Sequence, residues 1–192
     1  MRRAVLFIDG GYLAKISKGF GMPKLDFLAL SEMLCKERDD DDDDRLRTYY
    51  YYCMPFQGTP PSAEESSRYG RADKFVKTLT KLPKFEVRLG RFQKIQNGPS
   101  DDDAVYIQKG IDVMLAVDLV KMSWSKQIGR AIMLAADSDF IYAVQTAKDA
   151  GVSTRLCYSD RHPVSDLMLD VFDERLIITD DLLKHCLLPG SK

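Results

Sequence analysis

An alternation of apolar runs with a helical stretch constrains the fold of this chain more than any other feature of its sequence. Residues 131–136 form an apolar run, a helical stretch follows over 140–150 with Gly151 past its end, and residues 152–158 form a second run. This order predicts a strand–helix–strand unit with parallel strands, because the helix carries the chain back across the sheet. The expected fold class is therefore α/β, with a mainly parallel central sheet and helices on both faces.

Segments elsewhere in the chain fit the same pattern. Residues 4–8 are apolar throughout and lead into Asp9-Gly-Gly, so we expect a central strand buried on both faces and then a tight turn. Ser62-Ala-Glu-Glu is a capping-box sequence, and Pro83 forbids a helix from continuing past it. The helix over 111–124 is apolar on all sides, which predicts an internal position. Further strands are expected over 46–53 and 85–92, and further helices over 25–36 and 62–82.

Length and composition limit the classes of protein to which the chain can belong. Its 192 residues suit a single domain over 1–192, and 45% hydrophobic and 30% charged residues are ordinary values for a folded protein. No apolar stretch approaches the roughly 20 residues of a membrane span, and Met1-Arg2-Arg3 leads directly into the first strand rather than into a cleavable signal. We therefore expect a cytoplasmic protein without a membrane partner, and a homo-oligomer is compatible with the sequence.

Neither the cysteines nor the acidic runs predict a metal site. The four cysteines are far apart without a CxxC pair, and the two histidines are not at zinc-ligand spacing from them, so free buried thiols are expected. Six aspartates occupy 39–44, and three more end the polar segment over 97–103. Consecutive acids in a flexible loop cannot hold a fixed coordination geometry cheaply, so both segments are expected to be solvated loops.

Three aspartates follow two of the expected strands. Asp9 follows the run at 4–8, and Asp137 and Asp139 follow the run at 131–136. Singly, each acid could be a turn former or a helix cap. Ligands of open α/β sheets bind beyond the carboxyl ends of the strands, so the three carboxylates meet at one edge if these strands are neighbours. Their repulsion would then require protons or cations, and Mg²⁺ or Mn²⁺ suits oxygen ligands.

Other polar residues lie close to these positions in the sequence. Asp112 stands at the start of the helix over 111–124, where an acid either interacts with the helix dipole or reaches a cation. Asp118 is six residues further on, about 600° around the helix, so it is expected either beside the metal ligands or in solvent. Ser138, between the acids of the turn, is a further candidate for contact with the ligands. Lys109 could neutralise phosphate or simply face solvent.

Three segments, taken in order, resemble the successive motifs of the NYN domain. They are Phe-Ile-Asp-Gly-Gly-Tyr-Leu at 7–13, Gln-Lys-Gly-Ile-Asp-Val-Met-Leu-Ala-Val-Asp at 108–118 and Met-Leu-Ala-Ala-Asp-Ser-Asp-Phe at 133–140. The resemblance implies a PIN-like three-layer α/β/α fold and a metal-dependent ribonuclease. It also implies an acidic site, both metal-binding and catalytic, made of Asp9, Asp112, Asp137 and Asp139.

One position departs from this family pattern. NYN domains often have Asn three residues after the first acid, and here Tyr12 stands there. Its hydroxyl could replace the amide beside the metal ligands, or it could mark a subfamily with altered or absent cleavage. The alternative to a ribonuclease is therefore a non-catalytic RNA-binding or regulatory module that keeps the fold.

Two other enzyme classes are disfavoured by the residues after Asp9. A haloacid-dehalogenase-like phosphatase would ordinarily need a second acid where Gly11 stands. A dinucleotide-binding domain would need spaced glycines that cradle a phosphate, which Asp9-Gly-Gly lacks. If the chain cleaves RNA, the reaction would be hydrolysis by a metal-activated water, without a covalent intermediate.

Basic residues are concentrated between 68 and 94, where nine Lys or Arg are accompanied only by Asp73 and Glu86. On a helical wheel the cations of the helix over 62–82 fall within an arc of about 120°, opposite an apolar face. Most such faces are merely solvated, but further cations follow in the next segment, which favours contact with RNA. The residues expected to bind RNA are Arg71, Lys74, Lys77, Lys81, Arg88 and Arg91.

Overall fold

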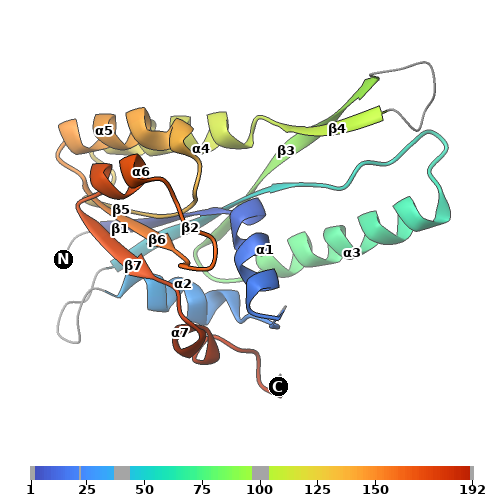
Figure 1. The fold of residues 1–192 in the computed structure, drawn as a ribbon, viewed down its shortest axis with the longest axis horizontal. Coiled ribbons are helices and arrows are strands. Elements are labelled where there is room, and N and C mark those ends of the chain that lie inside the picture. Colours follow the sequence, from blue (N-terminus) through green and yellow to red (C-terminus); the bar gives the residue numbers. More distant parts are fainter. Residues whose placement is uncertain (1–2, 22, 37–43, 97–103, 191–192) are drawn as a thin grey trace.

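A sheet of seven strands forms the centre of the protein (Figure 1). The computed structural model describes residues 3–21, 23–36, 44–96 and 104–190, with the backbone alone at 93–96 and 104–109. Within these ranges the strand order is β4-β3-β2-β1-β5-β6-β7, and all neighbours are parallel except β3 and β4. The expected mainly parallel sheet is confirmed. Its strands are β1 (Arg3–Asp9), β2 (Asp44–Cys53), β3 (Phe85–Gln96), β4 (Ala104–Lys109), β5 (Arg130–Leu134), β6 (Ser153–Tyr158) and β7 (Glu174–Ile177).

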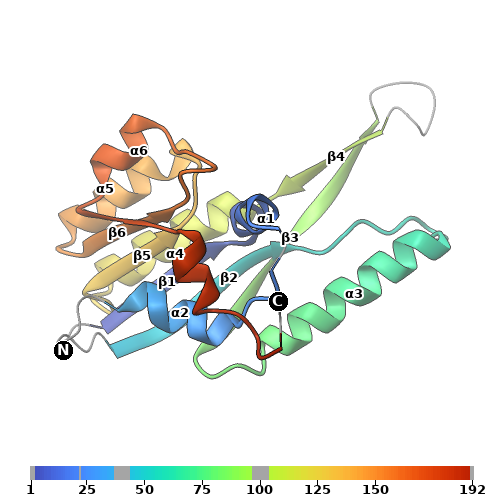
Figure 2. The same ribbon diagram turned by 60° about the horizontal axis from the view of Figure 1, so that its bottom comes forward.

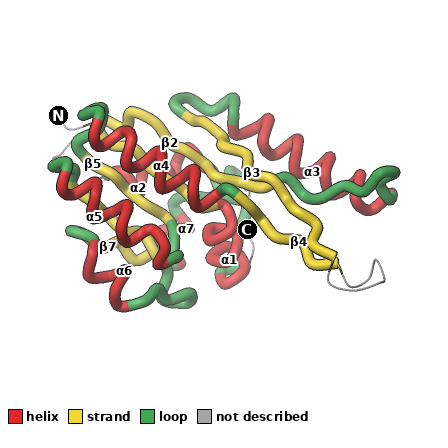
Figure 3. Tube along the Cα trace, turned by 90° about the horizontal axis from the view of Figure 1, so that it is seen from above, coloured by secondary structure: helices red, strands yellow, loops and turns green. Residues whose placement is uncertain are grey.

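Helices cover both faces of this sheet and complete a three-layer α/β/α arrangement (Figure 1), and Figure 3 looks down onto one of the two helical layers. Helices α4 (Ile111–Trp124), α5 (Ile141–Asp149) and α6 (Asp166–Val171) pack on one face. The other face carries α1 (Gly10–Gly19), α2 (Phe27–Cys35), the carboxyl end of α3 (Ala63–Leu79) and α7 (Asp180–Lys184). Strand β1 contributes Val5 and Phe7 to the first core and Leu6 and Ile8 to the second, because successive side chains of a strand alternate between its faces.

A helix, rather than only a tight turn, follows β1. Asp9 is the N-cap of α1, and its Oδ1 accepts a hydrogen bond of 2.8 Å from the backbone N–H of Gly11. Gly10 has to be glycine here, because a Cβ would stand 2.7 Å from the carbonyl oxygen of Tyr51 and 2.9 Å from the ring of Tyr50. Gly10 therefore lets α1 start directly against β2.

Helix α4 corrects the expectation of an internal helix. Only one stripe of α4 packs against the sheet, while Val113 and Val117 on its outer side are 67% and 56% exposed. Its apolar composition thus leaves an exposed apolar surface. Helix α3 is also shorter than expected, since it ends at Leu79 and leaves Lys81 in the following turn.

Two strands extend beyond the boundaries expected from the sequence. Strand β3 continues past residue 92 to Gln96 and pairs with β4, a strand the sequence pattern did not predict. Asp44 belongs to β2 rather than to an acidic loop, and its carboxylate bonds to the Lys84 ammonium at 2.8 Å. Residues 39–43 and 97–103 lie outside the described residues.

A buried ion-pair group joins the strands at the β7 side of the sheet. Glu174 of β7 accepts hydrogen bonds from Arg130 of β5, which has no exposed surface, and from Arg155 of β6. All four cysteines lie within the described residues, are buried and form no disulfide, as expected. Within the described part of the chain, no helix has both the length and the apolar character that crossing a bilayer would require.

Candidate functional site

The carboxyl edge of the sheet brings together acidic residues from three segments. Strands β1 and β5 are parallel neighbours, with Ile8 paired to Leu134, so Asp9 and the turn at 137–139 follow adjacent strand ends. The condition on which the meeting of these carboxylates depended, that the two strands be neighbours, is met. The start of α4 reaches the same region, because the Asp112 carboxylate interacts electrostatically with Asp9, Asp137 and Asp139.

Asp9 is the most enclosed of these acids. Burial raises the pKa of its carboxyl group, and the nearby Asp112 raises it further. Hydrogen bonds from the backbone of Gly11 and Tyr12, together with the charge of Lys15, act in the opposite direction but do not compensate. The folded protein therefore holds the ionised form of Asp9 at a cost, which a proton or a cation would relieve.

Lys15 is a cation near Asp9 that the sequence analysis did not single out. It is exposed on α1, a helix that the sequence pattern did not predict, and its charge favours the ionised form of Asp9. The sequence gives no clear signal for this proximity, because it depends on the helix that starts at Gly10. Lys15 could balance the charge of an anionic substrate near Asp9.

Asp112 is exposed in the first turn of α4. The N-cap of this helix is Gly110, whose φ of 88° is in the left-handed region and which provides no side-chain cap. The pKa of Asp112 is raised, first by partial burial and then by Asp137 and Asp139. The carboxylate is thus positioned by the start of the helix but repelled by its acidic neighbours.

In the turn after β5, Asp137 caps a short 3-10 helix over Ser138–Phe140. Its Oδ1 accepts a hydrogen bond of 2.9 Å from the Asp139 backbone N–H. Asp137, Ser138 and Asp139 are all exposed. Asp139 also lines a groove between α4 and α5 beside Tyr142. Among the described residues, no three Asp, Glu, His or Cys side chains already stand close enough around one point to hold an ion.

Asp118 contacts a different set of residues from these acids. Its Oδ2 accepts a hydrogen bond of 2.9 Å from the Tyr51 hydroxyl and lies 3.3 Å from Nε of Arg88. Its side chain is only 17% exposed, so Asp118 joins α4 to β2 and β3 and does not face solvent. The structure gives it a packing role of its own.

The Tyr12 hydroxyl is bonded to a distant loop and does not take the place of the asparagine amide in the family pattern. Its hydroxyl donates a hydrogen bond of 2.8 Å to the carbonyl of His162 and accepts one of 3.3 Å from the backbone of Ser159. The side chain is 4% exposed, and burial raises its pKa. Tyr12 therefore ties α1 to the loop after β6. Lys109 ends β4 just before α4, but its side chain lies outside the described part of the structure.

The basic residues form a less uniform surface than the helical wheel suggests. Lys74 and Arg91 are exposed, whereas Lys77 pairs with Asp73 at 2.7 Å and Arg71 donates a hydrogen bond to Ser67. Figure 2 shows α3 extending away from the layer of α4, α5 and α6.

Arg88 differs from the other members of the basic set. It pairs with Glu86 at 2.8 Å, lies 3.3 Å from Asp118, and stacks over the Tyr49 ring at 5.2 Å. Two carboxylates therefore already balance its charge, which weighs against the predicted contact of Arg88 with RNA.

Comparisons with known proteins identify the family. The model of the NYN domain matches residues 3–179. The chain is also similar to the crystal structure of a protein of unknown function from Vibrio parahaemolyticus, with a TM-score of 0.63 at 14% identity over 97% of each chain. That likeness extends to the fold alone, and no curated protein sequence matches the chain. The matched span and the three-layer architecture together show that the chain belongs to the NYN family and has its PIN-like fold.

Proposed function

We propose that the chain is a metal-dependent ribonuclease that hydrolyses RNA at the carboxylates of Asp9, Asp112, Asp137 and Asp139. The observation that carries this proposal is the meeting of acids from separate segments at one sheet edge, where Asp9 and the 137–139 turn follow neighbouring strands. Burial and the repulsion between these acids raise the pKa of Asp9 and Asp112, and carboxyl groups with raised pKa values are found preferentially at functional sites. Membership of the NYN family supports a nucleic acid as the substrate.

The donor set suits Mg²⁺ or Mn²⁺. All four candidate ligands are carboxylates, and hard divalent cations prefer oxygen ligands. Because no three of the described acidic side chains already surround one point, loading would require some of them to change rotamer. Three of the four acids are exposed, which leaves their side chains room to turn inward. When bound, the ion would lower the pKa of a water and neutralise charge that develops on the phosphate.

The four acids would contribute in different ways. Asp9 is the fixed ligand, because backbone hydrogen bonds from Gly11 and Tyr12 orient its carboxylate at the start of α1. Asp137 is likewise oriented by the backbone N–H of Asp139. Asp112 is the adjustable one, since it is exposed and its helix has no side-chain cap.

Cleavage of mixed single-stranded and structured RNA, with Mn²⁺ or with chelator, tests this proposal. We expect cleavage only with the metal, and a loss of at least about 100-fold for Asp9→Asn and for Asp112→Asn, since several kcal/mol of charge stabilisation depend on the ion. Asp26→Asn is the matched control, because Asp26 also caps a helix but lies outside the acidic group. Cleavage that persists in chelator, or in both site variants, would rule out the proposed site.

A non-catalytic RNA-binding module is the second candidate. The engagement of the Tyr12 hydroxyl by the loop after β6 favours it, because the amide usual in the family then has no substitute. In that case RNA would bind with the same affinity in Mn²⁺ and in chelator, would remain intact, and would be unaffected by Asp112→Asn.

A further inference from the structure

A cavity lies at the carboxyl end of β2, beside the middle of β3. Its volume is about 460 Å³, within the range of pockets that take small organic groups. The segment between β2 and α3 forms one wall, and β3 and the first turns of α3 form others. The lining residues are Tyr52, Cys53, Pro55, Phe56, Glu65, Arg68 and Phe92.

The lining of this cavity is close to two of the segments that carry the acids. Asp9 pairs with Tyr51 in the sheet, so the lining residues Tyr52 and Cys53 directly follow its register position on β2. A Cβ at Gly90 would stand 2.8 Å from both Cys53 Sγ and Ile111 Cδ1, so Gly90 lies against both side chains. Because Ile111 immediately precedes Asp112, the start of α4 lies near the Cys53 part of the lining.

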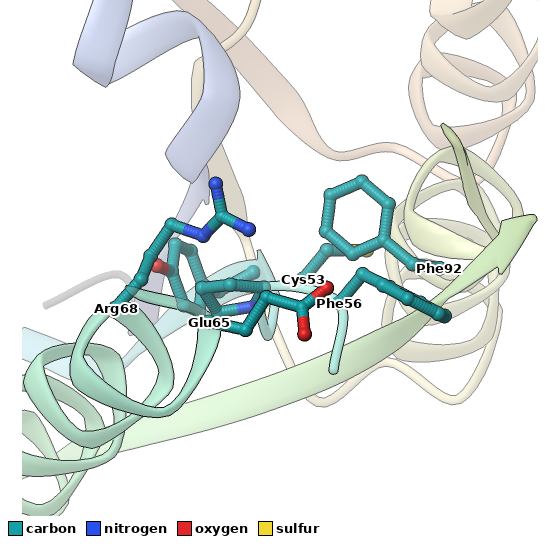
Figure 4. Close-up of a pocket in the computed structure, with 7 residues that line it drawn as sticks. Cys53, Phe56, Glu65, Arg68 and Phe92 are labelled. Carbon is teal, nitrogen blue, oxygen red and sulfur yellow. The ribbon is translucent and has the colours of Figure 1, made fainter. Parts of the chain in front are cut away.

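The chemistry of the cavity is divided between its walls (Figure 4). The rings of Phe56 and Phe92 lie on one side, and the charged groups of Glu65 and Arg68 come from α3 on the other. Glu65 stabilises the backbone of the cavity wall, because its carboxylate accepts hydrogen bonds from the backbone N–H groups of Ser62 at 2.8 Å and Gly58 at 3.3 Å. Arg68 is exposed and can therefore turn toward an anion.

Aromatic rings beside an arginine suit one class of ligand particularly well. A nucleobase can stack on a phenylalanine ring whatever its identity, while the guanidinium contacts the phosphate or the base plane. A base inside a duplex would first have to be unpaired and unstacked, which costs free energy. A base of an unpaired strand enters without the cost of unpairing, so the cavity favours single-stranded RNA.

We propose that this cavity binds one unstacked nucleobase of a single-stranded RNA whose backbone passes the aspartates. The inference rests on the proposed ribonuclease function and adds a substrate class to it. Phe92 and Phe56 would stack the base, and Arg68 would hold the adjoining phosphate. RNA would thus be selected for local single-strandedness beside the hydrolytic site.

Binding measured in chelator tests the cavity without relying on cleavage. The probe is a short single-stranded RNA carrying one 2-aminopurine, whose fluorescence falls when the base stacks. We expect quenching with the wild type, affinity about 5- to 150-fold weaker for Phe92→Ala, and no competition from a blunt duplex of the same sequence. Arg68→Gln should also weaken binding and make its salt dependence shallower.

Matched variants separate stacking from packing and from overall charge. Phe92→Leu keeps an apolar side chain but removes the ring, so it should lose quenching even where Phe92→Ala fails to fold. Leu89→Ala on β3 and Lys184→Gln on α7, both exposed, should bind like the wild type. Affinity and quenching within twofold of the wild type in Phe92→Leu and Arg68→Gln, or equal binding of the duplex, would overturn the proposal.

The outcomes also distinguish the cavity from the hydrolytic site. Quenching that depends on Phe92 without any Mn²⁺-dependent cleavage would uphold the base-binding cavity and refute the ribonuclease proposal. Cleavage that is abolished by Asp9→Asn but unaffected by Phe92→Leu and Arg68→Gln would refute the base-binding cavity and uphold the ribonuclease proposal. Quenching by a free mononucleotide but not by the oligonucleotide would overturn an RNA-binding role.

Discussion

Replacing Asp9 with Asn should stabilise the metal-free protein. The amide is as good an N-cap as the carboxylate, so the hydrogen bond from Gly11 at 2.8 Å can be kept. The variant removes the repulsion from Asp112, about 0.2–0.5 kcal/mol for a like-charge pair of this kind, and the penalty for burying a charge. We expect a total gain of about 0.5–1 kcal/mol, or about 1–4 °C in Tm.

Thermal unfolding in chelator at low ionic strength measures this gain. Its pH dependence provides the check on the cause. The folded-state pKa of Asp9 lies above the unfolded value of 3.8, so wild-type Asp9 becomes neutral first in the folded protein as the pH falls. The advantage of Asp9→Asn should therefore be full at neutral pH and vanish as the pH falls through the folded pKa toward about 3.8.

Added Mn²⁺ should reverse the order of stability. Ligand at 100 times its Kd stabilises the protein that binds it by about 2.7 kcal/mol, which exceeds the gain from the amide. Asp26→Asn, an equivalent change at the N-cap of α2, should neither raise the metal-free stability nor alter the stabilisation by Mn²⁺. A lower metal-free Tm for Asp9→Asn would refute the reasoning, since it would mean that the carboxylate has a stabilising partner. A gain that persists at low pH would show that the effect is not electrostatic.

Three further variants test other parts of the account. Tyr51→Phe removes the hydroxyl that is hydrogen-bonded to Asp118, so it should lower the free energy of unfolding measured in urea by about 1–2 kcal/mol. Mn²⁺-dependent cleavage should stay within a few-fold of the wild type, and a complete loss of cleavage would place Asp118 in the catalytic site. Lys74→Gln should make the log–log slope of RNA affinity against salt concentration shallower by about 0.7. Lys77→Gln should change this slope by less, because Asp73 already balances the charge of Lys77. Equal slopes in both variants and the wild type would mean that α3 only faces solvent. Glu174→Gln should lower the free energy of unfolding in denaturant by about 2 kcal/mol, less than for a fully buried ion pair because the Glu174 side chain is 36% exposed. An unchanged free energy of unfolding would mean that water solvates Arg130 and Arg155 once the carboxylate is gone.

The central strands and the position of the acids could be predicted from the sequence. The runs at 4–8 and 131–136 are apolar at every position, which is the pattern of strands covered on both faces. Each run is followed closely by acids, so the meeting of Asp9 with the 137–139 turn required only that the two strands be neighbours, as they are. The same reasoning predicted the capping box of α3, and it is present.

Features that depend on contacts between distant segments could not be predicted in this way. The contact of Asp118 with Tyr51 depends on how α4 is rotated against β2, and the partners of Tyr12 are about 150 residues away. Helix α1 was hidden by Gly10 and Gly11, which have low helix propensity, although Gly10 is also what allows the close approach to β2. Strand β4 is short and gains its hydrogen bonds from β3, so its own residues give little signal.

Locating Mn²⁺ by anomalous scattering in crystals soaked at a concentration that supports RNA cleavage tests the central claim most directly. We predict a peak at the carboxyl edge of the sheet, within about 2–2.6 Å of carboxylate oxygens from Asp9 and Asp112 and close to the 137–139 turn. The peak should disappear in the double variant Asp9→Asn with Asp112→Asn. A manganese ion bound elsewhere in active protein, with none at this edge, would contradict the proposed function.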